Sequence, residues 1–174
     1  MTTARRARRS GRIVPSFPNG ENRPYPGVVN SRRSDIRVVC GVVARNGADE
    51  LLLMRRADEG TWGLPGGGVE PGETWELAAK RECLEETGWT VRVTGVLGVY
   101  SDPETQTHTY PSGERVHLVG VVFTADAEFA DGPRDAEATE VRFFPVGDLP
   151  EPLFEPDRPV LADYVSRRAT PVIG

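Results

Sequence analysis

Residues 67–89 read GGVEPGETWELAAKRECLEETGW and carry glutamates at regular spacings. Glu82, Glu85 and Glu86 fall within one turn of any helix formed here, because residues three and four apart are neighbours on a helix surface. Like charges at those spacings repel one another and destabilise the helix. The stretch therefore predicts a cationic partner beside the three carboxylates, and a hard divalent ion is the obvious candidate because it prefers carboxylate oxygens.

The same stretch shows where this helix begins and ends. Thr74 is a residue type that caps helix N-termini, and Gly88 is the type that follows a helix C-terminus. Ala78 and Ala79 are small enough to let the helix lie close to a sheet. The glycines and prolines of residues 63–72 predict a loop before the helix.

Outside this stretch, short apolar segments separated by turn residues predict strands. The expected strands are 36–45, 50–56, 89–101, 114–125 and 140–146, with a final helix over 157–168. The first two are expected to form a hairpin. Residues 102–113 are long for a strand connection, and long ordered loops are often functional, so we expect this loop to border a pocket. Strands with two inserted helices indicate an α/β fold with a mixed sheet covered on its faces.

Length and composition fit one globular domain. The chain has 174 residues, 38% of them hydrophobic, and no apolar run approaches the roughly 20 residues that a membrane-spanning helix needs. Apolar residues do not follow the N-terminal arginines, so no secretory signal is expected. Cys40 and Cys83 are too few for a disulfide framework. Together these features predict a cytoplasmic protein with no membrane partner.

Charge is distributed unevenly along the chain. Residues 1–37 carry nine arginines against two acidic residues, a net charge of +7, which leaves −12 for the remainder. An acidic body excludes a duplex DNA binder, which needs a basic face. Residues 1–34 are rich in arginine and proline and predict an N-terminal arm, with residues 35–174 as the folded domain. An RNA-binding role for the arginines of residues 5–12 stays open beside a solvated or surface-docked arm.

The spacing of the fixed residues is specific. Gly67 is followed after five residues by Glu73, and Glu73 after seven residues by RECLEETGW, residues 81–89. This pattern resembles the Nudix box, GX5EX7REUXEEXGU, in which U is a bulky apolar residue. Every fixed letter matches, and the departures are confined to two U positions, where Cys83 is small and Trp89 is larger than usual.

The resemblance extends from about Val38 to about Pro150 and implies a Nudix-like α/β/α sandwich with a mixed β-sheet. It also implies hydrolysis of a diphosphate linkage with Mg²⁺ or Mn²⁺ as the cofactor. The metal ligands implied are the Gly66 carbonyl and the carboxylates of Glu82, Glu85 and Glu86.

Arg81 is adjacent to Glu82, and neighbouring side chains project about 100° apart on a helix, so Arg81 is not expected to face the same way. The resemblance implies that it pairs with helix and loop glutamates and orients them. Glu73 is the expected partner of Arg81. It is expected to hold Arg81 in place, and so to help orient the metal ligands without binding the metal itself.

A general base must take a proton from the attacking water. The resemblance places this base either in the box, at Glu82, or at a glutamate outside it. Glu137 is favoured outside the box, as a base or an additional metal ligand, and Glu140, Glu104 and Glu114 are the alternatives. The expected catalytic residues are therefore Glu82, Glu85 and Glu137.

Four residues are candidates for substrate binding. Arg55 and Arg56 end a strand just before the glycines, and strand alternation lets at most one of them point inward toward phosphate. His108 lies in the long loop, and Tyr100 ends the strand before it. Aromatic residues that could contact a base are also explained by core packing; they are Trp62, Tyr100, Tyr110, Phe143 and Phe144.

Three functions fit the resemblance. The first is hydrolysis of a nucleoside diphosphate derivative, of the ADP-ribose or nucleotide-sugar type. The second is hydrolysis of nucleoside triphosphates, including oxidised ones, with release of pyrophosphate. The third is a non-catalytic module that senses a nucleotide, against which the intact set of box carboxylates argues. Many Nudix proteins are homodimers, and the arm of residues 1–34 is long enough to reach a partner chain.

Overall fold

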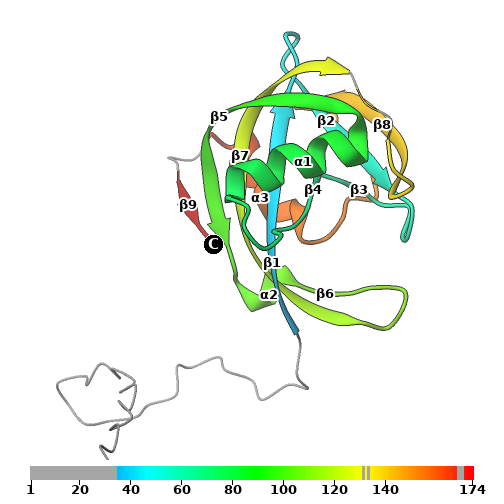
Figure 1. Ribbon diagram of the computed structural model, residues 1–174, viewed down its shortest axis with the longest axis vertical. Helices are drawn as coiled ribbons and strands as arrows, with labels where there is room; N and C mark the ends of the chain where they lie inside the picture. Colours follow the sequence, from blue (N-terminus) through cyan, green and yellow to red (C-terminus); the bar gives the residue numbers. More distant parts are fainter. Residues whose placement is uncertain (1–34, 131, 133, 168–170) are drawn as a thin grey trace, which may run out of the picture. The chain divides into compact units, whose positions relative to one another are not determined.

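A computed structural model describes residues 35–130, 132, 134–167 and 171–174. Figure 1 shows these residues as strands and helices coloured along the sequence. The predicted arm, residues 1–34, lies outside the described residues, so its structure stays a prediction. Within the described part of the chain, no helix is long and apolar enough to cross a membrane.

Nine strands form one mixed sheet in the described part of the chain. They are β1 (Asp35–Arg45), β2 (Glu50–Arg56), β3 (Trp62–Gly63), β4 (Gly66–Gly68), β5 (Trp89–Tyr100), β6 (Thr107–Thr109), β7 (Arg115–Ala130), β8 (Ala138–Pro145) and β9 (Val172–Ile173). The main path of neighbours is β3-β2-β1-β7-β5-β9, while β4 pairs with β1, β6 with β7 and β8 with β2. The pairs β1–β7 and β5–β9 are parallel and the others are antiparallel.

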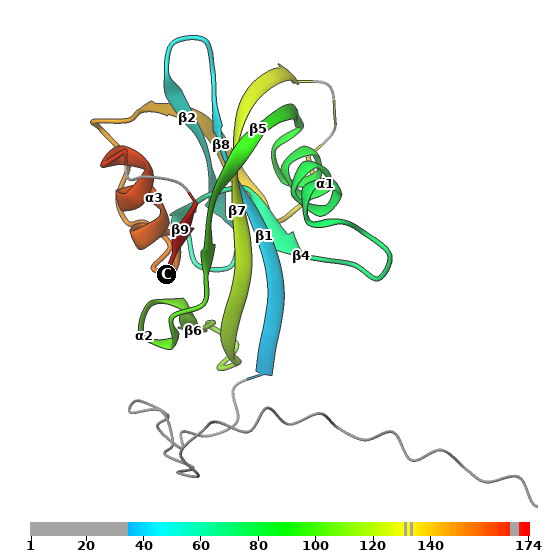
Figure 2. The same cartoon turned by 90° about the vertical axis from the view of Figure 1, so that its left-hand side faces the viewer.

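Helices cover both faces of this sheet. They are α1 (Trp75–Thr87), the short α2 (Pro103–Gln106) and α3 (Asp157–Val165). Figure 2 shows α1 and α3 on opposite sides of the strands. The predicted α/β/α sandwich with a mixed sheet is confirmed.

Two hydrophobic clusters hold the layers together, one on each face. Strand alternation divides neighbouring side chains between them, so that Leu52 joins the cluster that contains Ala78 and Ala79 of α1. Leu51 and Leu53 join the other cluster, which contains residues of α3. Both alanines are fully buried, as the expected close approach of helix to sheet requires.

The first two strands are antiparallel neighbours, as the predicted hairpin requires, but their pairing is short. β1 and β2 pair only at Arg45 and Leu51, beside their connecting turn. Beyond that point β1 runs parallel to β7 along its whole length, and β2 pairs with β8. The parallel partner is distant in sequence, and periodicity within a strand does not reveal which strand lies beside it.

Two segments predicted as loops contain secondary structure. Residues 66–68 form β4, which pairs with residues 39–41 of β1. Residues 102–113 contain α2 and β6, and β6 pairs with the start of β7. At three residues each, β4 and β6 are too short to show strand periodicity, and they are defined by their hydrogen bonds with neighbouring strands.

Candidate functional site

The box helix is capped as its sequence predicts. Thr74 adopts an extended backbone, and its hydroxyl oxygen accepts a hydrogen bond from the Leu77 amide at 3.2 Å. Gly88 has a φ of 74°, and its amide donates to the Leu84 carbonyl at 2.8 Å. A residue with a side chain is strained at that φ, so glycine is the natural residue there. The two caps place all three box glutamates on one 13-residue helix.

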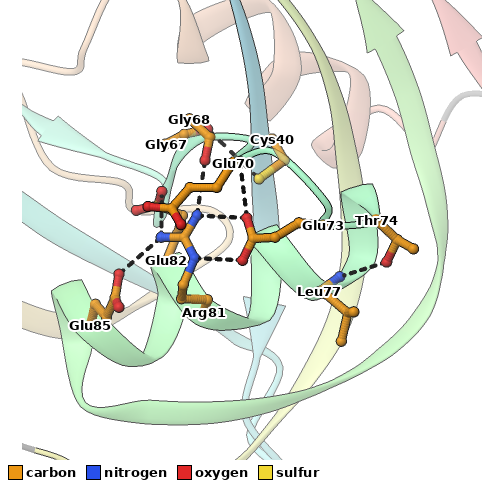
Figure 3. Close-up of polar contacts among 10 residues, drawn as sticks. All are labelled: Cys40, Gly67, Gly68, Glu70, Glu73, Thr74, Leu77, Arg81, Glu82 and Glu85. Atoms are coloured by element: carbon orange, nitrogen blue, oxygen red, sulfur yellow. Dashed lines mark hydrogen bonds and ion pairs between the residues drawn. The ribbon is translucent and has the colours of Figure 1, made fainter.

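Arg81 connects this helix to the glycine segment before it (Figure 3). Its Nε and Nη2 donate to the two carboxylate oxygens of Glu73, at 2.8 and 2.9 Å. Nη2 also donates to the Gly68 carbonyl at 2.9 Å. The bidentate pair holds the pKa of Glu73 near 2, well below its ordinary value.

The expectation that Arg81 points away from Glu82 is wrong. Its Nη1 donates to Glu82 at 2.9 Å and to Glu85 at 3.0 Å. The long flexible side chain overcomes the angular offset between neighbouring residues. Part of the repulsion between the box glutamates is therefore offset by an arginine of the same helix.

Glu86 has a different environment from the other two box glutamates. It is only 2% exposed, and one carboxylate oxygen accepts from the Gly66 amide at 2.8 Å. Burial, together with the nearby charges of Glu82 and Glu137, raises the pKa of Glu86 to about 8, although the hydrogen bond from Gly66 and the charge of Arg56 act to lower it. This buried acid therefore lacks full charge compensation from its neighbours.

Gly67 faces the carboxylate of Glu82 directly. A Cβ atom at Gly67 would lie 2.6 Å from the Glu82 carboxylate, and a Cβ at Gly66 would lie 2.3 Å from the Cys40 carbonyl oxygen. Both distances are far inside van der Waals contact. The box glycine therefore leaves the space that the Glu82 carboxylate occupies.

These groups line one cavity of about 950 Å³. Its walls include the three glycines of β4 and residues of β1, α1, the end of β2 and the turn between β6 and β7. The lining side chains that can carry charge are Arg37, Arg56, Asp58, Glu82, Glu86, Tyr110, Glu114 and Glu137. The cavity thus joins Glu82 and Glu86 of the box to arginines and acids from distant parts of the sequence, whereas Glu85 does not line it.

Glu137 is brought to this cavity by a loop anchored at both ends. The Asp135 amide donates to the Glu85 carbonyl at 2.8 Å, and the Ala57 amide donates to the Glu137 carbonyl at 2.8 Å. The loop is therefore fixed against α1 on one side and the end of β2 on the other. Glu137 shares the cavity wall with Glu82. Burial raises the pKa of Glu82, and the charges of Glu85 and Glu137 add to this rise, whereas Arg81 lowers the pKa.

Of the other three glutamates considered for the base, only Glu114 lines the cavity. Glu140 lies in β8 and pairs with Arg142, and Glu104 lies in α2; neither lines the cavity. Glu114 does line it, but its carboxylate is paired with Arg37 at 2.5 Å.

Of the consecutive residues Arg55 and Arg56, only one points into the cavity, as strand alternation predicts. Arg56 lines the cavity, and its guanidinium donates to both oxygens of Asp58, at 3.2 and 2.8 Å. It also lies over the Phe154 ring, 4.5 Å from the centroid. Arg55 is exposed and donates to the Gly60 carbonyl at 3.1 Å, away from the cavity.

Tyr100 and His108 do not line the large cavity, although Tyr100 lines a smaller pocket beside it, and their role toward substrate stays a prediction. Tyr100 is 3% exposed in the core on the α3 side, and its hydroxyl donates to Asp163 at 3.3 Å. His108 lies behind the cavity wall, with Nε2 2.5 Å from a Glu59 carboxylate oxygen. Its ring makes edge contacts with Tyr110 and Phe154, at centroid distances of 4.8 and 4.7 Å.

Sequence reasoning missed Arg37 and Asp58 as cavity residues. Arg37 was counted with the basic N-terminal segment, and Asp58 was not considered. Tyr110 was a candidate only among several aromatics. Arg37 could be recognised as a cavity residue only from the pairing of β1 with β4 and β7. This pairing brings the N-terminal half of β1 to the cavity.

Comparison with known proteins identifies the family. The model of the NUDIX domain matches residues 35–164. The chain belongs to the Nudix family. The predicted resemblance is therefore confirmed, over a longer segment than expected.

Nudix relatives occur among both characterised proteins and solved structures. An ADP-ribose pyrophosphatase of Methanocaldococcus jannaschii is 35% identical over 130 residues, which are 73% of this chain and 71% of the relative. Nucleoside triphosphatase NudI of Enterobacter sp. strain 638 is 36% identical over 91 residues, 49% of this chain and 64% of the relative. A Nudix hydrolase structure from Nitrosomonas europaea is 26% identical, with a TM-score of 0.61 over 82% of this chain and 77% of the other. The chain is a Nudix pyrophosphohydrolase that acts on nucleotide derivatives.

Nudix hydrolases generally need a divalent metal ion, and the cavity wall suits one. Glu86 is a buried acid beside Glu82 and Glu137, an environment that a divalent cation would stabilise. In the described part of the chain, however, no three acidic, histidine or cysteine side chains are already arranged around one point. The predicted cradle of three box glutamates is thus altered by Arg81, which holds Glu82 and Glu85.

Proposed function

We propose that this Nudix hydrolase cleaves the diphosphate linkage of a nucleoside diphosphate derivative, of the ADP-ribose or nucleotide-sugar type. The observation that carries the proposal is the single cavity that joins Glu82, Glu86 and Glu137 to the inward-facing Arg56. Carboxylates suit a divalent ion, and an arginine suits phosphate oxygens. The wall therefore combines the two kinds of group that a diphosphate requires.

Glu82 and Glu86, with the Gly66 carbonyl, would hold Mg²⁺ or Mn²⁺, and Glu85 would join them on releasing Arg81. When bound, the ion offsets the charge of the diphosphate and lowers the pKa of water. Arg81 holds Glu82 in place through the contact described above, and Glu73 holds Arg81 in turn. Arg56, fixed by Asp58 and Phe154, would bind a phosphate oxygen without a large loss of side-chain freedom.

Glu137 is the better candidate for the general base. The Glu82 carboxylate is already engaged by Arg81 and would ligate the metal ion, so it is less free to turn toward the attacking water. Glu137 reaches the same cavity from a separate, anchored loop. It can therefore accept a proton while the box carboxylates remain in place.

The size of the cavity supports a substrate larger than a diphosphate. A volume of about 950 Å³ lies at the upper end of the roughly 300–1,000 Å³ common for ligand sites. The ADP-ribose pyrophosphatase relative supports the sugar-linked class. The nucleoside triphosphatase relative supports the second candidate, release of pyrophosphate from nucleoside triphosphates.

Product analysis separates the two candidates. Purified protein would be incubated with ADP-ribose, ADP-glucose, UDP-glucose and the nucleoside triphosphates, with Mg²⁺ and separately with Mn²⁺, and the products separated by ion exchange. A nucleoside monophosphate plus a sugar phosphate supports the proposal. A monophosphate plus pyrophosphate, without cleavage of any sugar-linked compound, contradicts it.

Two glutamates three residues apart test the assignment of the base. We expect Glu137→Gln to lower kcat by roughly 100-fold or more, since general base catalysis contributes about that much. Glu140→Gln is the matched control, because Glu140 lies outside the cavity, and it should retain activity. Equal kcat values for the two variants would exclude Glu137 as the base.

We also infer a cytoplasmic location and a homodimer. The two free, buried cysteines support the location, and the family resemblance supports the dimer. Gel filtration of the full chain and of residues 35–174 tests the dimer and any part that the arm plays in it. A monomer at all concentrations would contradict it.

A further inference from the structure

A charged pair lies in the cavity at the turn between β6 and β7. Arg37 of β1 donates through Nη2 to a Glu114 carboxylate oxygen at 2.5 Å, and both side chains are 46% exposed. The turn is held by the Tyr110 amide, which donates to the Glu114 carbonyl at 2.9 Å. Arg37, Tyr110 and Glu114 all line the cavity, and the roles assigned to the box residues do not involve them.

The pairing of β1 with β4, the strand of three glycines, gives the distance from Arg37 to those glycines. Val39 pairs with Gly68, and Arg37 precedes Val39 by two residues. At a rise of about 3.3 Å per residue, Arg37 lies about 7 Å along β1 from the glycine strand. That separation corresponds to roughly one monosaccharide unit beyond a phosphate held beside the glycines.

The chemistry of the pair favours a neutral, hydroxylated group. A carboxylate accepts hydrogen bonds from hydroxyl groups, and a guanidinium donates to hydroxyl and ring oxygens. Because the two charges compensate each other, Glu114 removes the attraction that Arg37 alone would offer to an additional phosphate.

A nucleobase fits this end of the cavity less well. Stacking needs an open aromatic face, but the guanidinium carbons of Arg37 and Arg56 lie 5.7 and 5.8 Å from the centroid of the Tyr110 ring. Tyr110 is the aromatic residue that lines this end of the cavity, and its ring is already in contact with two guanidinium groups. A sugar ring needs hydrogen-bonding partners and only a small apolar surface.

We propose that Arg37, Tyr110 and Glu114 bind the sugar that is attached to the diphosphate opposite the nucleoside, and that Glu114 selects against a third phosphate. This inference rests on the proposed function and names the residues that would decide between its two candidate substrate classes. Glu114, once considered as a base, is thereby a specificity-determining residue.

The test compares Glu114→Gln and Arg37→Gln with the unmodified protein. The substrates are the fastest-cleaved compound among ADP-ribose, ADP-glucose and UDP-glucose, and the triphosphate of the same nucleoside. We expect Glu114→Gln to raise KM for the sugar-linked substrate about tenfold, the loss of one charged hydrogen bond, with little change in kcat. Its kcat/KM for the triphosphate should stay constant or rise, and Arg37→Gln should also raise KM for the sugar-linked substrate.

Glu155→Gln is the matched control, because Glu155 pairs with Arg158 at 3.2 Å and does not line the cavity. Its KM values should equal those of the unmodified protein, and thermal unfolding would show that all three variants fold.

If the sugar-linked substrate is cleaved but Glu114→Gln leaves the ratio of the two kcat/KM values unchanged, the inference is overturned and the proposed function stands. An equal loss for both substrates also overturns it, since the residue would then contact the shared nucleoside. If the unmodified protein cleaves no sugar-linked compound, the proposed function is contradicted, and so is the inference that rests on it.

Discussion

At the scale of single residues, three consecutive glycines have three different surroundings. A Cβ at Gly66 would meet the Cys40 carbonyl oxygen at 2.3 Å, whereas one at Gly67 would meet the Glu82 carboxylate at 2.6 Å. A Cβ at Gly68 would have no atom within 4 Å. The first contact is with backbone, which cannot move without disturbing the pairing of β4 and β1, and the second is with a side chain in the cavity.

Alanine at each glycine should therefore give a different result. Gly66→Ala should lower the free energy of unfolding by about 1–3 kcal/mol, as overpacking does. Gly67→Ala should reduce activity strongly with a smaller loss of stability, because Glu82 must move. Gly68→Ala is the control and should change neither. Thermal unfolding and kcat/KM would be measured for all three, and indistinguishable variants would refute these separate roles.

Glu86 carries a second prediction at this scale. With its pKa raised to about 8, the buried acid disfavours folding at neutral pH, so Glu86→Gln should stabilise the metal-free protein by about 1–3 kcal/mol. Activity should nevertheless be lost, because an amide is a poor ligand for a divalent ion. Glu85→Gln should not stabilise, since Glu85 is half exposed and bonded to Arg81. Chemical denaturation in the presence of a chelator measures both, and a loss of stability in Glu86→Gln would contradict this view of the cavity wall.

Sequence spacing placed the three box glutamates on one turn of helix, and the structure agrees. It did not separate buried Glu86 from exposed Glu85, because that difference depends on which side of α1 faces the glycine strand. Nor did it show Arg81 between Glu82 and Glu85, since side-chain reach is not contained in helical angles.

At the scale of elements, Arg81 joins α1 to the segment that leads into it. One guanidinium contacts Glu73, the Gly68 carbonyl, Glu82 and Glu85. Lysine has a single nitrogen and cannot reproduce this planar set of donors. We expect Arg81→Lys to lower kcat by at least about tenfold, the loss typical for residues that support metal ligands. Lys80→Arg, at a neighbouring exposed position paired with Glu76, is the control. Full activity of Arg81→Lys would show that the four contacts are dispensable.

Asp157 connects α3 to the segment between β3 and β4. Its carboxylate accepts from the Leu64 amide at 2.7 Å, and burial raises its pKa from 3.8 to about 6. Between these values the folded state holds a proton that the unfolded state has released, so this group makes the free energy of unfolding fall as pH rises through the window. The loss, complete above about pH 6, amounts to about 3 kcal/mol.

Asparagine at position 157 keeps an oxygen for the Leu64 amide but cannot ionise. The stability difference between Asp157→Asn and the unmodified protein should therefore grow in favour of the variant between about pH 4 and pH 6. Urea unfolding at a series of pH values measures this difference. A difference that is constant with pH would show that the carboxyl group has an ordinary pKa.

Most strands and the two longer helices could be predicted from periodicity and capping residues. The main strand pairing could not, because β1 pairs along its whole length with β7, a strand distant in sequence. The short strands β4 and β6 could not be predicted either, since three residues show no periodicity. They are defined by the strands with which they pair.

At the scale of the whole described domain, the site is assembled from parts that no single motif contains. The box supplies Glu82 and Glu86, a loop 50 residues later supplies Glu137, and the two ends of the β1–β2 region supply Arg37 and Arg56. The box residues could be predicted because their spacing is local. The other residues reach the cavity only through the pairing of β1 with β7 and of β2 with β8.

The central claim is that the cavity wall formed by Glu82, Glu86 and Glu137 holds the divalent ion used in cleavage. Calorimetric titration of Mn²⁺ into the unmodified protein, Glu86→Gln and the exposed control Glu76→Gln tests it most directly. We expect the first and third proteins to bind Mn²⁺ alike, and Glu86→Gln to bind at least about tenfold more weakly. Equal Mn²⁺ affinity in all three proteins would contradict the claim.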